Sequence, residues 1–281
     1  MNVRWVKMNY KELQPDCEKC FGLCCVALYF SSINGFPINK DVGKTCINLA
    51  GDFKCKVHEN LNEKGLKGCI AYDCIGAGQK VAQVTYSGHD WKEKPAYSTE
   101  MFDVFIIMKQ RHEMLWYLNE AVRLQNNSNI NKDKLIIKID EIENLTHLEA
   151  KSIINLDLTS IKVGVNALLL QTSEFLREKV NNGKNTIKGK KALGRTLNLM
   201  GADLRKRYLR GINLSGAFLI AANLRGVDLS FTDLIGSDLR DADLSEANLS
   251  NSIFITQAQI NSAKGDANTR LPKSITRPRH W

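Results

Sequence analysis

Leucine recurs every five residues through the last third of the chain. The series runs through Leu199, Leu204, Leu209, Leu214, Leu219, Leu224, Leu229, Leu234, Leu239, Leu244 and Leu249, and Phe254 keeps the register. The side chain two positions earlier is mostly small, and Asp or Asn usually fills the position between, as in Ala242-Asp243-Leu244. An α-helix repeats every 3.6 residues and a strand every two, so neither explains a period of five. A fixed period of this kind is typical of a repeat architecture.

The period predicts a coil of square cross-section. If four five-residue units complete one turn, residues twenty positions apart stack in columns. One inward column of leucines is then Leu204, Leu224 and Leu244. The small residues that face the same narrow shaft are Ala202, Ala222 and Ala242. The expected polar columns on the outside are Asp203 with Asn223 and Asp243, Asp228 with Asn248, and Asn213 with Asp233. Each buried leucine would contribute roughly 1.5–3 kcal/mol.

This segment, about 197–260, resembles the pentapeptide-repeat family, whose motif is A(D/N)LXX. The resemblance implies a right-handed quadrilateral β-helix, in which about three coils spaced about 4.8 Å apart give a solenoid roughly 15 Å long. Arg207 and Tyr208 depart from this motif ahead of Leu209. We therefore expect the first coil to be irregular.

The charge of the repeat bears on its expected partner. Some pentapeptide-repeat proteins protect DNA gyrase from quinolones or peptide toxins, and a long acidic rod is thought to imitate duplex DNA. Residues 196–260 hold six basic and seven acidic residues, whereas the whole chain has a net charge of +9. A short, nearly neutral solenoid does not favour DNA mimicry, so we expect a protein partner. The apolar Ile253, Phe254 and Ile255 predict either a homodimer seam or a site covered by the tail.

All eight cysteines lie near the N-terminus and predict a metal-binding module. The candidate ligands, with one histidine, are Cys17, Cys20, Cys24, Cys25, Cys46, Cys55, His58, Cys69 and Cys74. The spacing Cys17-Glu-Lys-Cys20 puts two thiols on one tight turn, as is usual for Zn²⁺ or a cluster iron. Soft thiolates suit both, so the cofactor stays open between zinc and an iron–sulfur cluster. Cys24 and Cys25 would point different ways in an extended chain, so we do not expect both to hold one ion.

The Cys-x2-Cys-x3-Cys-Cys run at 17–25, with the spaced cysteines that follow it, resembles a family of small bacterial zinc- or iron-chelating proteins. The resemblance implies chelation of one of these metals. It does not say which thiols bind, because Cys69 and Cys74 extend beyond the family's pattern. Two other interpretations stay open, namely buried free cysteines and a redox pair at Cys24-Cys25.

The fold class expected for the whole chain is a multidomain α + β-solenoid. Apolar residues at helical spacing predict helices over about 101–122, 135–148 and 159–180, the last capped by Asp157 or Thr159 and ended at 181–183. His112 lies on the first apolar stripe, where a core role is expected rather than ligation. The expected segments are a Cys-rich metal module at 1–95, a helical connection at 96–195, the repeat at 196–260 and a basic tail at 261–281.

The location and function follow from the same features. No apolar run suggests an ordinary signal peptide or a membrane span, so a cytoplasmic, bacterial protein is expected. In that compartment clustered cysteines favour metal or redox chemistry over disulfides. Neither Gly-x-Ser-x-Gly nor His-Glu-x-x-His occurs, and no catalytic residue is predicted.

We expect a binding protein rather than an enzyme, one that protects against an antimicrobial or toxic natural product by binding a partner. One alternative is an iron–sulfur or metal-dependent redox protein that uses the solenoid as a scaffold. Another is a regulator whose metal state controls docking of the repeat.

Overall fold

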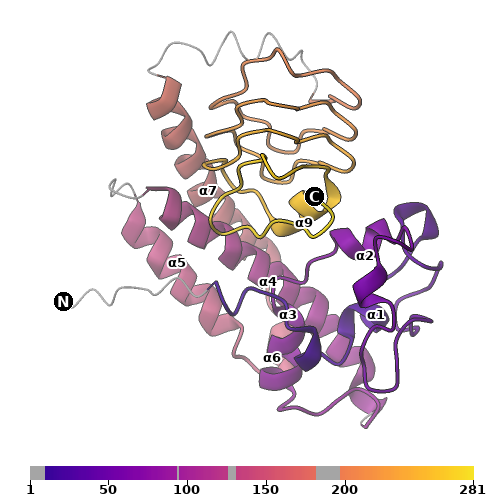
Figure 1. Ribbon diagram of the computed structural model, residues 1–281. Helices are drawn as coiled ribbons and strands as arrows, with labels where there is room; N and C mark the ends of the chain where they lie inside the picture. The colour runs from indigo at the N-terminus through magenta and orange to yellow at the C-terminus, as the bar shows by residue number, and fades with distance from the viewer. Residues whose placement is uncertain (1–9, 94, 126–130, 182–196) are drawn as a thin grey trace. The chain divides into compact units, whose positions relative to one another are not determined.

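The computed structural model describes residues 10–93, 95–125, 131–181 and 197–281 (Figure 1). The chain forms two compact units. Unit 1 is drawn from Met1–Cys69, Asp73–Asn119 and Asn131–Asn166. Unit 2 is drawn from Ile70–Tyr72, Glu120–Ile130 and Ala167–Trp281. The cysteines therefore belong to unit 1 and the leucine repeat to unit 2.

Short helices separated by loops make up the cysteine-bearing part. They are η1 (Cys17–Lys19), α1 (Leu23–Ala27), η2 (Ser32–Asn34), η3 (His58–Asn60), α2 (Lys67–Ala71), α3 (Ala77–Lys80) and η4 (Val81–Thr85). The elements that follow are η5 (Pro95–Tyr97), α4 (Ser98–Gln125), α5 (Lys132–Leu145), α6 (Ala150–Ile154), α7 (Leu158–Asn181) and α9 (Gln257–Ser262).

The predicted helical middle is confirmed, since α4, α5 and α7 cover the three expected runs. At the start of α7 the Asp157 carboxylate accepts hydrogen bonds from the backbone N–H groups of Thr159 and Ser160, at 3.0 and 3.2 Å, as an N-cap does. Residues 182 and 183, expected to end this helix, lie outside the described residues. His112 is buried on α4 and donates from Nδ1 to the carbonyl oxygen of Ile75 at 2.7 Å, in the core role that the sequence indicates.

The twenty-residue coil is confirmed by its backbone pairing. Parallel bridges join Asn198 to Phe218, Asp203 to Asn223, Asn213 to Asp233 and Asp228 to Asn248, among others. Within the described ranges these bridges are isolated, and no extended strand forms. The expectation of a β-helix therefore holds for the pairing but not for continuous strands. Turns recur every five residues and leave too short a straight segment on each side of the square.

Left-handed backbone at the second residue after most leucines makes the corners of the square. Glycine supplies this conformation without strain at Gly226 (φ 69°) and Gly236 (φ 64°). Phe231 and Asp241 adopt it as well, at φ 58° and 57°. The chain therefore turns by the same local geometry whether or not a glycine is present.

The shaft is filled as the repeat predicts. All the leucines from Leu204 to Leu249 are buried, and so are the small residues Ala222 and Ala242. The first coil departs from the pattern, because no bridge joins the exposed Tyr208 to Asp228 beneath it, although both are described. The expected irregularity of the first coil is thus confirmed. A side chain as large as tyrosine points outward at this position.

The C-terminal tail closes the last coil. Lys264 and Arg270 form parallel bridges with Asp243 and Asn248, so the tail continues the stack beyond the repeat. The indole Nε1 of Trp281 donates to the carbonyl oxygen of Ala263 at 3.0 Å.

The apolar residues at the end of the last coil are buried within the single chain; they are Ile253, Phe254 and Ile255. This burial agrees with a covered site, and the homodimer stays a prediction. None of the helices in the described parts of the chain is long and apolar enough to cross a bilayer.

Candidate functional site

The predicted thiols of unit 1 fall into two neighbourhoods. We call Cys17, Cys20 and Cys74 the knuckle thiols. Cys20 and Cys74 are each followed by two residues with left-handed backbone. We call Cys24, Cys25, Cys46, Cys55 and Cys69 the loop thiols; burial raises the pKa of Cys69, and the charges of Cys46 and Cys55 contribute to the rise. All eight cysteines are free, and Cys17 is exposed whereas Cys20 is buried. His58 is exposed at the start of η3, and no hydrogen bond or ion pair described for it involves a thiol.

The knuckle thiols meet between η1 and α3. The Cys20 thiol donates to the carbonyl oxygen of Cys17 at 3.4 Å. Interaction with the Cys17 side chain, and with the backbone of Gly22 and Leu23, lowers the pKa of Cys20. Cys74 also receives backbone N–H groups, but burial dominates and raises its pKa to about 11. The thiolate is therefore favoured at Cys20, whereas burial favours the thiol at Cys74.

A glycine allows close packing beside the knuckle thiols. A Cβ atom at Gly78 would lie 2.8 Å from the Cβ of Cys20, and 3.8 and 3.9 Å from the Sγ atoms of Cys20 and Cys74. The backbone at Gly78 therefore packs tightly against Cys20, near both sulfurs. Any residue larger than glycine would clash with the Cys20 side chain.

Two glutamine side chains hold the Cys17 loop against the segment that carries Gly78. Gln79 donates from Nε2 to the carbonyl oxygen of Gln14 at 2.7 Å, and its Oε1 accepts from the N–H of Asp16 at 3.1 Å. Gln83 donates from Nε2 to the carbonyl oxygen of Lys19 at 2.9 Å. These bonds fix Cys17 and Cys20 relative to Cys74 through the backbone, independently of any metal.

The loop thiols are brought together by different segments. The backbone N–H of Cys46 donates to the carbonyl oxygen of Cys25 at 2.9 Å, and Leu49 bridges to Cys55. The Sγ atoms of Cys24 and Cys25 are 3.9 Å apart. The expectation that these two side chains diverge is therefore wrong, because the pair lies in helix α1 and not in extended chain.

A buried lysine accompanies the loop thiols. Lys40 Nζ donates to the carbonyl oxygens of Val26, at 3.3 Å, and of Leu28, and lies 4.4 Å from the centre of the Phe30 ring. Burial lowers its pKa, whereas Cys46 and its neighbours favour the charged form. An ammonium group in this place would offset negative charge on the loop thiols.

The donor set is compatible with a soft metal, although no ligand sphere is preformed. Among the residues that the structure describes, no three Cys, His, Asp or Glu side chains surround one point as ligands do. Interactions at Cys20 nevertheless favour its thiolate, the form that binds metal ions.

In unit 2, helix α7 covers one of the four faces of the solenoid. Ser173 on this helix donates its hydroxyl to the buried carboxylate of Asp233, and Arg177 donates from Nε to the Ser173 hydroxyl at 3.1 Å. Burial raises the pKa of Asp233, and the Ser173 bond opposes that rise. Figure 1 shows α7 running beside the coils. Asp233 and Ile253 of this column are therefore buried within unit 2, and Asn213 is half-buried.

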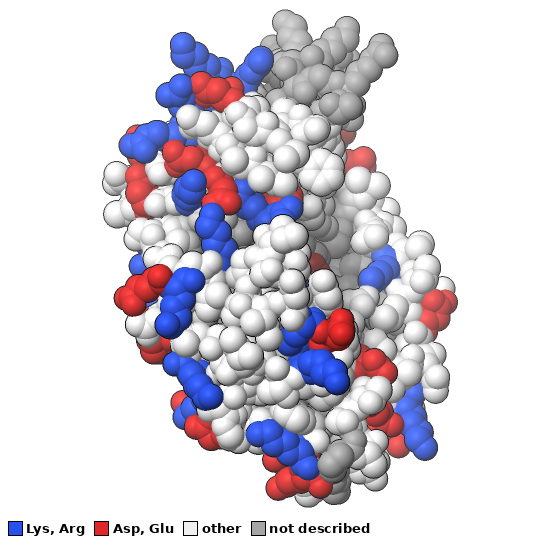
Figure 2. All heavy atoms as spheres, turned by 90° about the vertical axis from the view of Figure 1, so that its right-hand side faces the viewer, with Lys and Arg blue, Asp and Glu red and all other residues white. Residues whose placement is uncertain are grey.

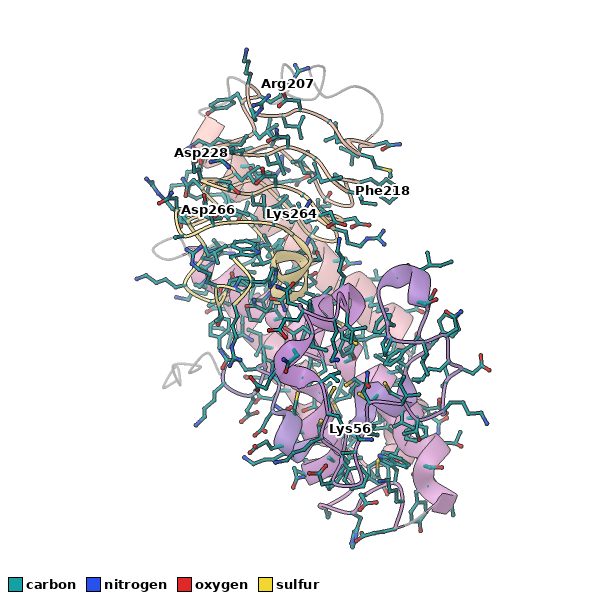
Figure 3. The ribbon with its side chains drawn as sticks, turned by 45° about the vertical axis from the view of Figure 1, so that its right-hand side comes forward. Lys56, Arg207, Phe218, Asp228, Lys264 and Asp266 are labelled. Atoms are coloured by element: carbon teal, nitrogen blue, oxygen red, sulfur yellow. The ribbon has the colours of Figure 1, made fainter. Side chains whose placement is uncertain are left out.

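Another face carries an exposed apolar patch, which we define as Leu197, Met200 and Phe218. Their exposed fractions are 40%, 55% and 53%. The backbone N–H of Phe218 donates to the carbonyl oxygen of Leu197 at 2.9 Å, so the patch spans the first two coils. Figure 3 shows Phe218 and Asp228 projecting from opposite sides of the solenoid.

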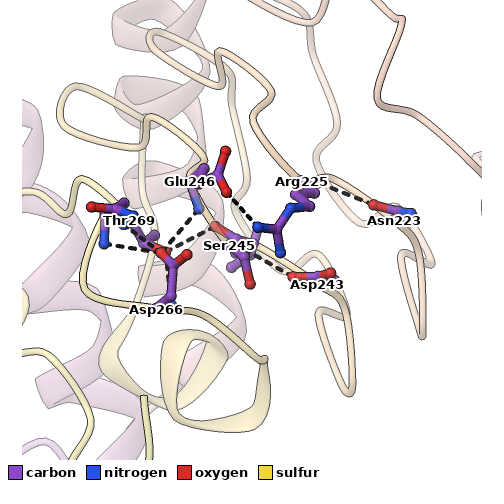
Figure 4. Close-up of polar contacts among 9 residues, drawn as sticks. Asn223, Arg225, Asp243, Ser245, Glu246, Asp266 and Thr269 are labelled. Carbon is purple, nitrogen blue, oxygen red and sulfur yellow. Dashed lines mark hydrogen bonds and ion pairs between the residues drawn. The ribbon is translucent and has the colours of Figure 1, made fainter.

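Polar bonds between coils mark the face that ends at the tail. Arg225 pairs with Glu246 on the next coil, and the backbone N–H of Glu246 donates to the Asp266 carboxylate at 3.0 Å (Figure 4). Asp266 also accepts from Thr269, and these bonds lower its pKa. The polar side chains named on this face are therefore bonded to one another or to the tail. On the side of the molecule in Figure 2, basic and acidic side chains are interspersed.

Sequence reasoning missed several residues that shape these places. The repeated Cys-x-Gly signal at 20–22 and 74–76 was available, and so was Gly78 two residues later. Lys40 and Ser173 give no signal, because an isolated lysine or serine reads as a surface residue until the packing is known.

Comparison with known proteins supports the repeat, but the matching family model does not extend to the cysteine-bearing part. The family model described as pentapeptide repeats (8 copies) matches residues 198–241 and 222–255. A Bacillus subtilis (strain 168) protein described as "Uncharacterized protein YybG" is 50% identical over 270 residues, which cover 96% of this chain and 95% of that protein. No solved structure matches the chain significantly.

Proposed function

The chain belongs to the same family as YybG of Bacillus subtilis and carries pentapeptide repeats, and from this premise we propose that it acts by binding a protein partner rather than by catalysis. The partner docks on the apolar patch of the solenoid. The consequence of docking is protection against an antimicrobial or toxic natural product. The cysteine module binds a metal ion and accompanies this activity.

The apolar patch is the observation that carries the proposal. Of the other faces, one is covered by α7 and one is engaged by polar bonds that lead into the tail. Phe218 and Met200 are more than half exposed although each could have been a polar residue at an outward position of the repeat. Exposed aromatic and methionine side chains in a group are typical of protein interaction sites.

A susceptibility assay with matched variants tests the proposal. Deletion of the gene should lower the tolerance of the host to at least one agent in a panel of antimicrobials and peptide toxins, and the wild-type chain should restore it. The double variant Phe218→Ser/Met200→Ser should fail to restore it. Tyr208→Ser removes an equally exposed aromatic side chain outside the patch and should restore tolerance fully.

Three results would count against the proposal. Unchanged tolerance after deletion and after overexpression would remove the protective function. Full rescue by the patch variant would remove the patch as the docking site. Failure of Tyr208→Ser to rescue would show that the effect of the serine substitutions is not local.

A second candidate is a metal-dependent redox protein or sensor, favoured by the donors around the knuckle thiols. Protein purified without oxygen should then be coloured, and a Cys17→Ser/Cys20→Ser variant should lose the absorption of thiolate-bound iron. Colourless protein with stoichiometric zinc would instead make the module structural. Protein that is metal-free and stably folded would contradict both the redox candidate and the metal site.

A further inference from the structure

Three aromatic side chains from separate segments of unit 1 lie together, and we call Phe21, Phe53 and Trp91 the aromatic site. The ring centres of Phe21 and Phe53 are 5.4 Å apart, and those of Phe53 and Trp91 are 5.6 Å apart. The ring planes are inclined by 60° and 69°, so the rings do not form a flat stack. All three residues are half-buried, which leaves part of this group accessible to a ligand.

The backbone holds these rings at an energetic cost. Phe21 and Phe53 are both left-handed, at φ of 51° and 66°, although bulky residues rarely adopt this conformation. Gly22 lets the two segments approach each other, because a Cβ atom there would lie 3.0 Å from the carbonyl oxygen of Phe53. The indole Nε1 of Trp91 donates to the carbonyl oxygen of Phe21 at 2.9 Å. Strain at two members of one aromatic group points to a binding role for that group.

A cation of the chain itself occupies the aromatic site. Lys92 Nζ lies 4.2 Å from the centre of the Phe53 ring and 5.3 Å from that of the Trp91 ring. The same nitrogen donates to the carbonyl oxygen of Gly51 at 3.1 Å. Ring faces attract cations electrostatically, and the carbonyl oxygen needs a donor that carries hydrogen. The contacts at this place therefore match a primary ammonium group.

Lys92 is held in a way that allows it to be displaced. It is exposed, and among the residues that the structure describes its ammonium group has no carboxylate partner. Lys40 is the contrasting case, since its ammonium also lies over a phenylalanine ring but is buried and bonded to the carbonyl oxygens of Val26 and Leu28. Attraction to a ring at an exposed position is weak, and the long lysine stem can carry its charge into water.

We propose that the aromatic site binds the primary ammonium group of a small alkylamine, which takes the place of Lys92 over Phe53 and Trp91. The Gly51 carbonyl oxygen accepts a hydrogen bond from this ligand. A quaternary ammonium ion of the same charge has no N–H group to donate and binds less tightly. The site uses neither the cysteines nor the apolar patch, so its test is separate from that of the proposed function.

The test titrates the full-length chain with n-butylammonium and follows the upfield ring-current shift of the methylene protons by NMR. Lys92→Ala removes the resident cation and should lower the dissociation constant by about two- to fivefold relative to wild type. Lys54→Ala is the control, because it removes the same charge from an exposed lysine that pairs with Glu18, outside the rings. It should leave the dissociation constant unchanged.

Two further measurements in the Lys92→Ala background address the rings and the carbonyl oxygen. Phe53→Leu should weaken n-butylammonium binding by about threefold or more, whereas Phe53→Tyr, which keeps a ring, should not. Tyr29→Leu, at an exposed aromatic residue outside the site, is the matched control. Tetramethylammonium should bind less tightly than n-butylammonium. Circular dichroism establishes that each variant is folded, and the comparison of the two ammonium ions needs no ring variant.

Four results would overturn the inference and leave the proposed function standing. The first is an absence of n-butylammonium binding to Lys92→Ala. The second is an equal gain in Lys54→Ala, which would reduce the effect to net charge. The third is full binding by folded Phe53→Leu, and the fourth is tetramethylammonium binding as tightly as n-butylammonium.

Discussion

Truncation of one central leucine should destabilise the solenoid strongly. Leu224 is fully buried between Leu204 and Leu244, which are buried as well. The backbone around it is held from both sides, since Asn223 donates to Ala202 and Leu224 donates to Asp243, each at 2.9 Å. The walls of the resulting cavity can therefore collapse little.

The cost of Leu224→Ala follows from that rigidity. Leucine-to-alanine changes in cores lower the free energy of unfolding by about 2.7–5.0 kcal/mol, and the largest values belong to sites that do not collapse. We expect about 3–5 kcal/mol here. Phe218→Ala, an outward change on a neighbouring unit, should cost about 0.5 kcal/mol or less.

Hydrogen–deuterium exchange of the backbone amides in residues 198–255 measures this cost within unit 2. A single unfolding midpoint would not, because a chain of two units need not unfold in one step. Opening free energies that fall by similar amounts in Leu224→Ala and Phe218→Ala would refute the shaft as the source of stability. A fall confined to Leu224→Ala supports it.

Three further predictions concern other parts of the chain. Trp281→Ala should remove the contact that covers Ala263 and lower the free energy of unfolding of unit 2 by about 1–3 kcal/mol, seen as faster amide exchange in residues 253–264; unchanged exchange would contradict a capping role. Ser173→Ala should leave the buried Asp233 carboxylate with one donor fewer and cost about 1–3 kcal/mol, measured by exchange in α7 and the facing coil, and equal exchange would show that the bond contributes nothing. Burial lowers the pKa of His112 from 6.5 to about 4, so the unfolded chain takes up the proton first as the pH falls. Unit 1 should therefore lose about 3 kcal/mol between about pH 6.5 and 4, a loss seen in urea unfolding and absent in His112→Asn, and an unchanged pH dependence in that variant would exclude His112 as the cause.

The repeat is the part of the fold that the sequence predicts best. A period of five residues, with leucine inside and Asp or Asn outside, leads directly to the columns of Leu224 and of Asp228 with Asn248. In the described coils the predicted stacking is made by isolated parallel bridges, because stacking depends on the period whereas strand length depends on the turns. The burial of Asp233 under α7 could not be predicted from the sequence, since Asp233 has the same motif position as exposed residues such as Asp203.

The cysteine module is less predictable for a physical reason. Sequence spacing identifies Cys17 and Cys20 as one turn, but the approach of Cys74 depends on how α3 packs against η1. The divergence expected of Cys24 and Cys25 failed because a helical turn was not foreseen there. Spacing constrains neighbours along the chain, and packing decides the partners that are distant in it.

The cover of one solenoid face by α7 has a consequence for how such a chain can change in length during evolution. Deleting or adding a single pentapeptide ahead of Asp233 would rotate every later side chain by a quarter turn, and another residue would stand opposite Ser173. A change of four pentapeptides would restore the alignment. Insertions and deletions in the repeats of related chains should therefore occur in steps of twenty residues, with single-unit changes confined to chains that have lost the helix contact.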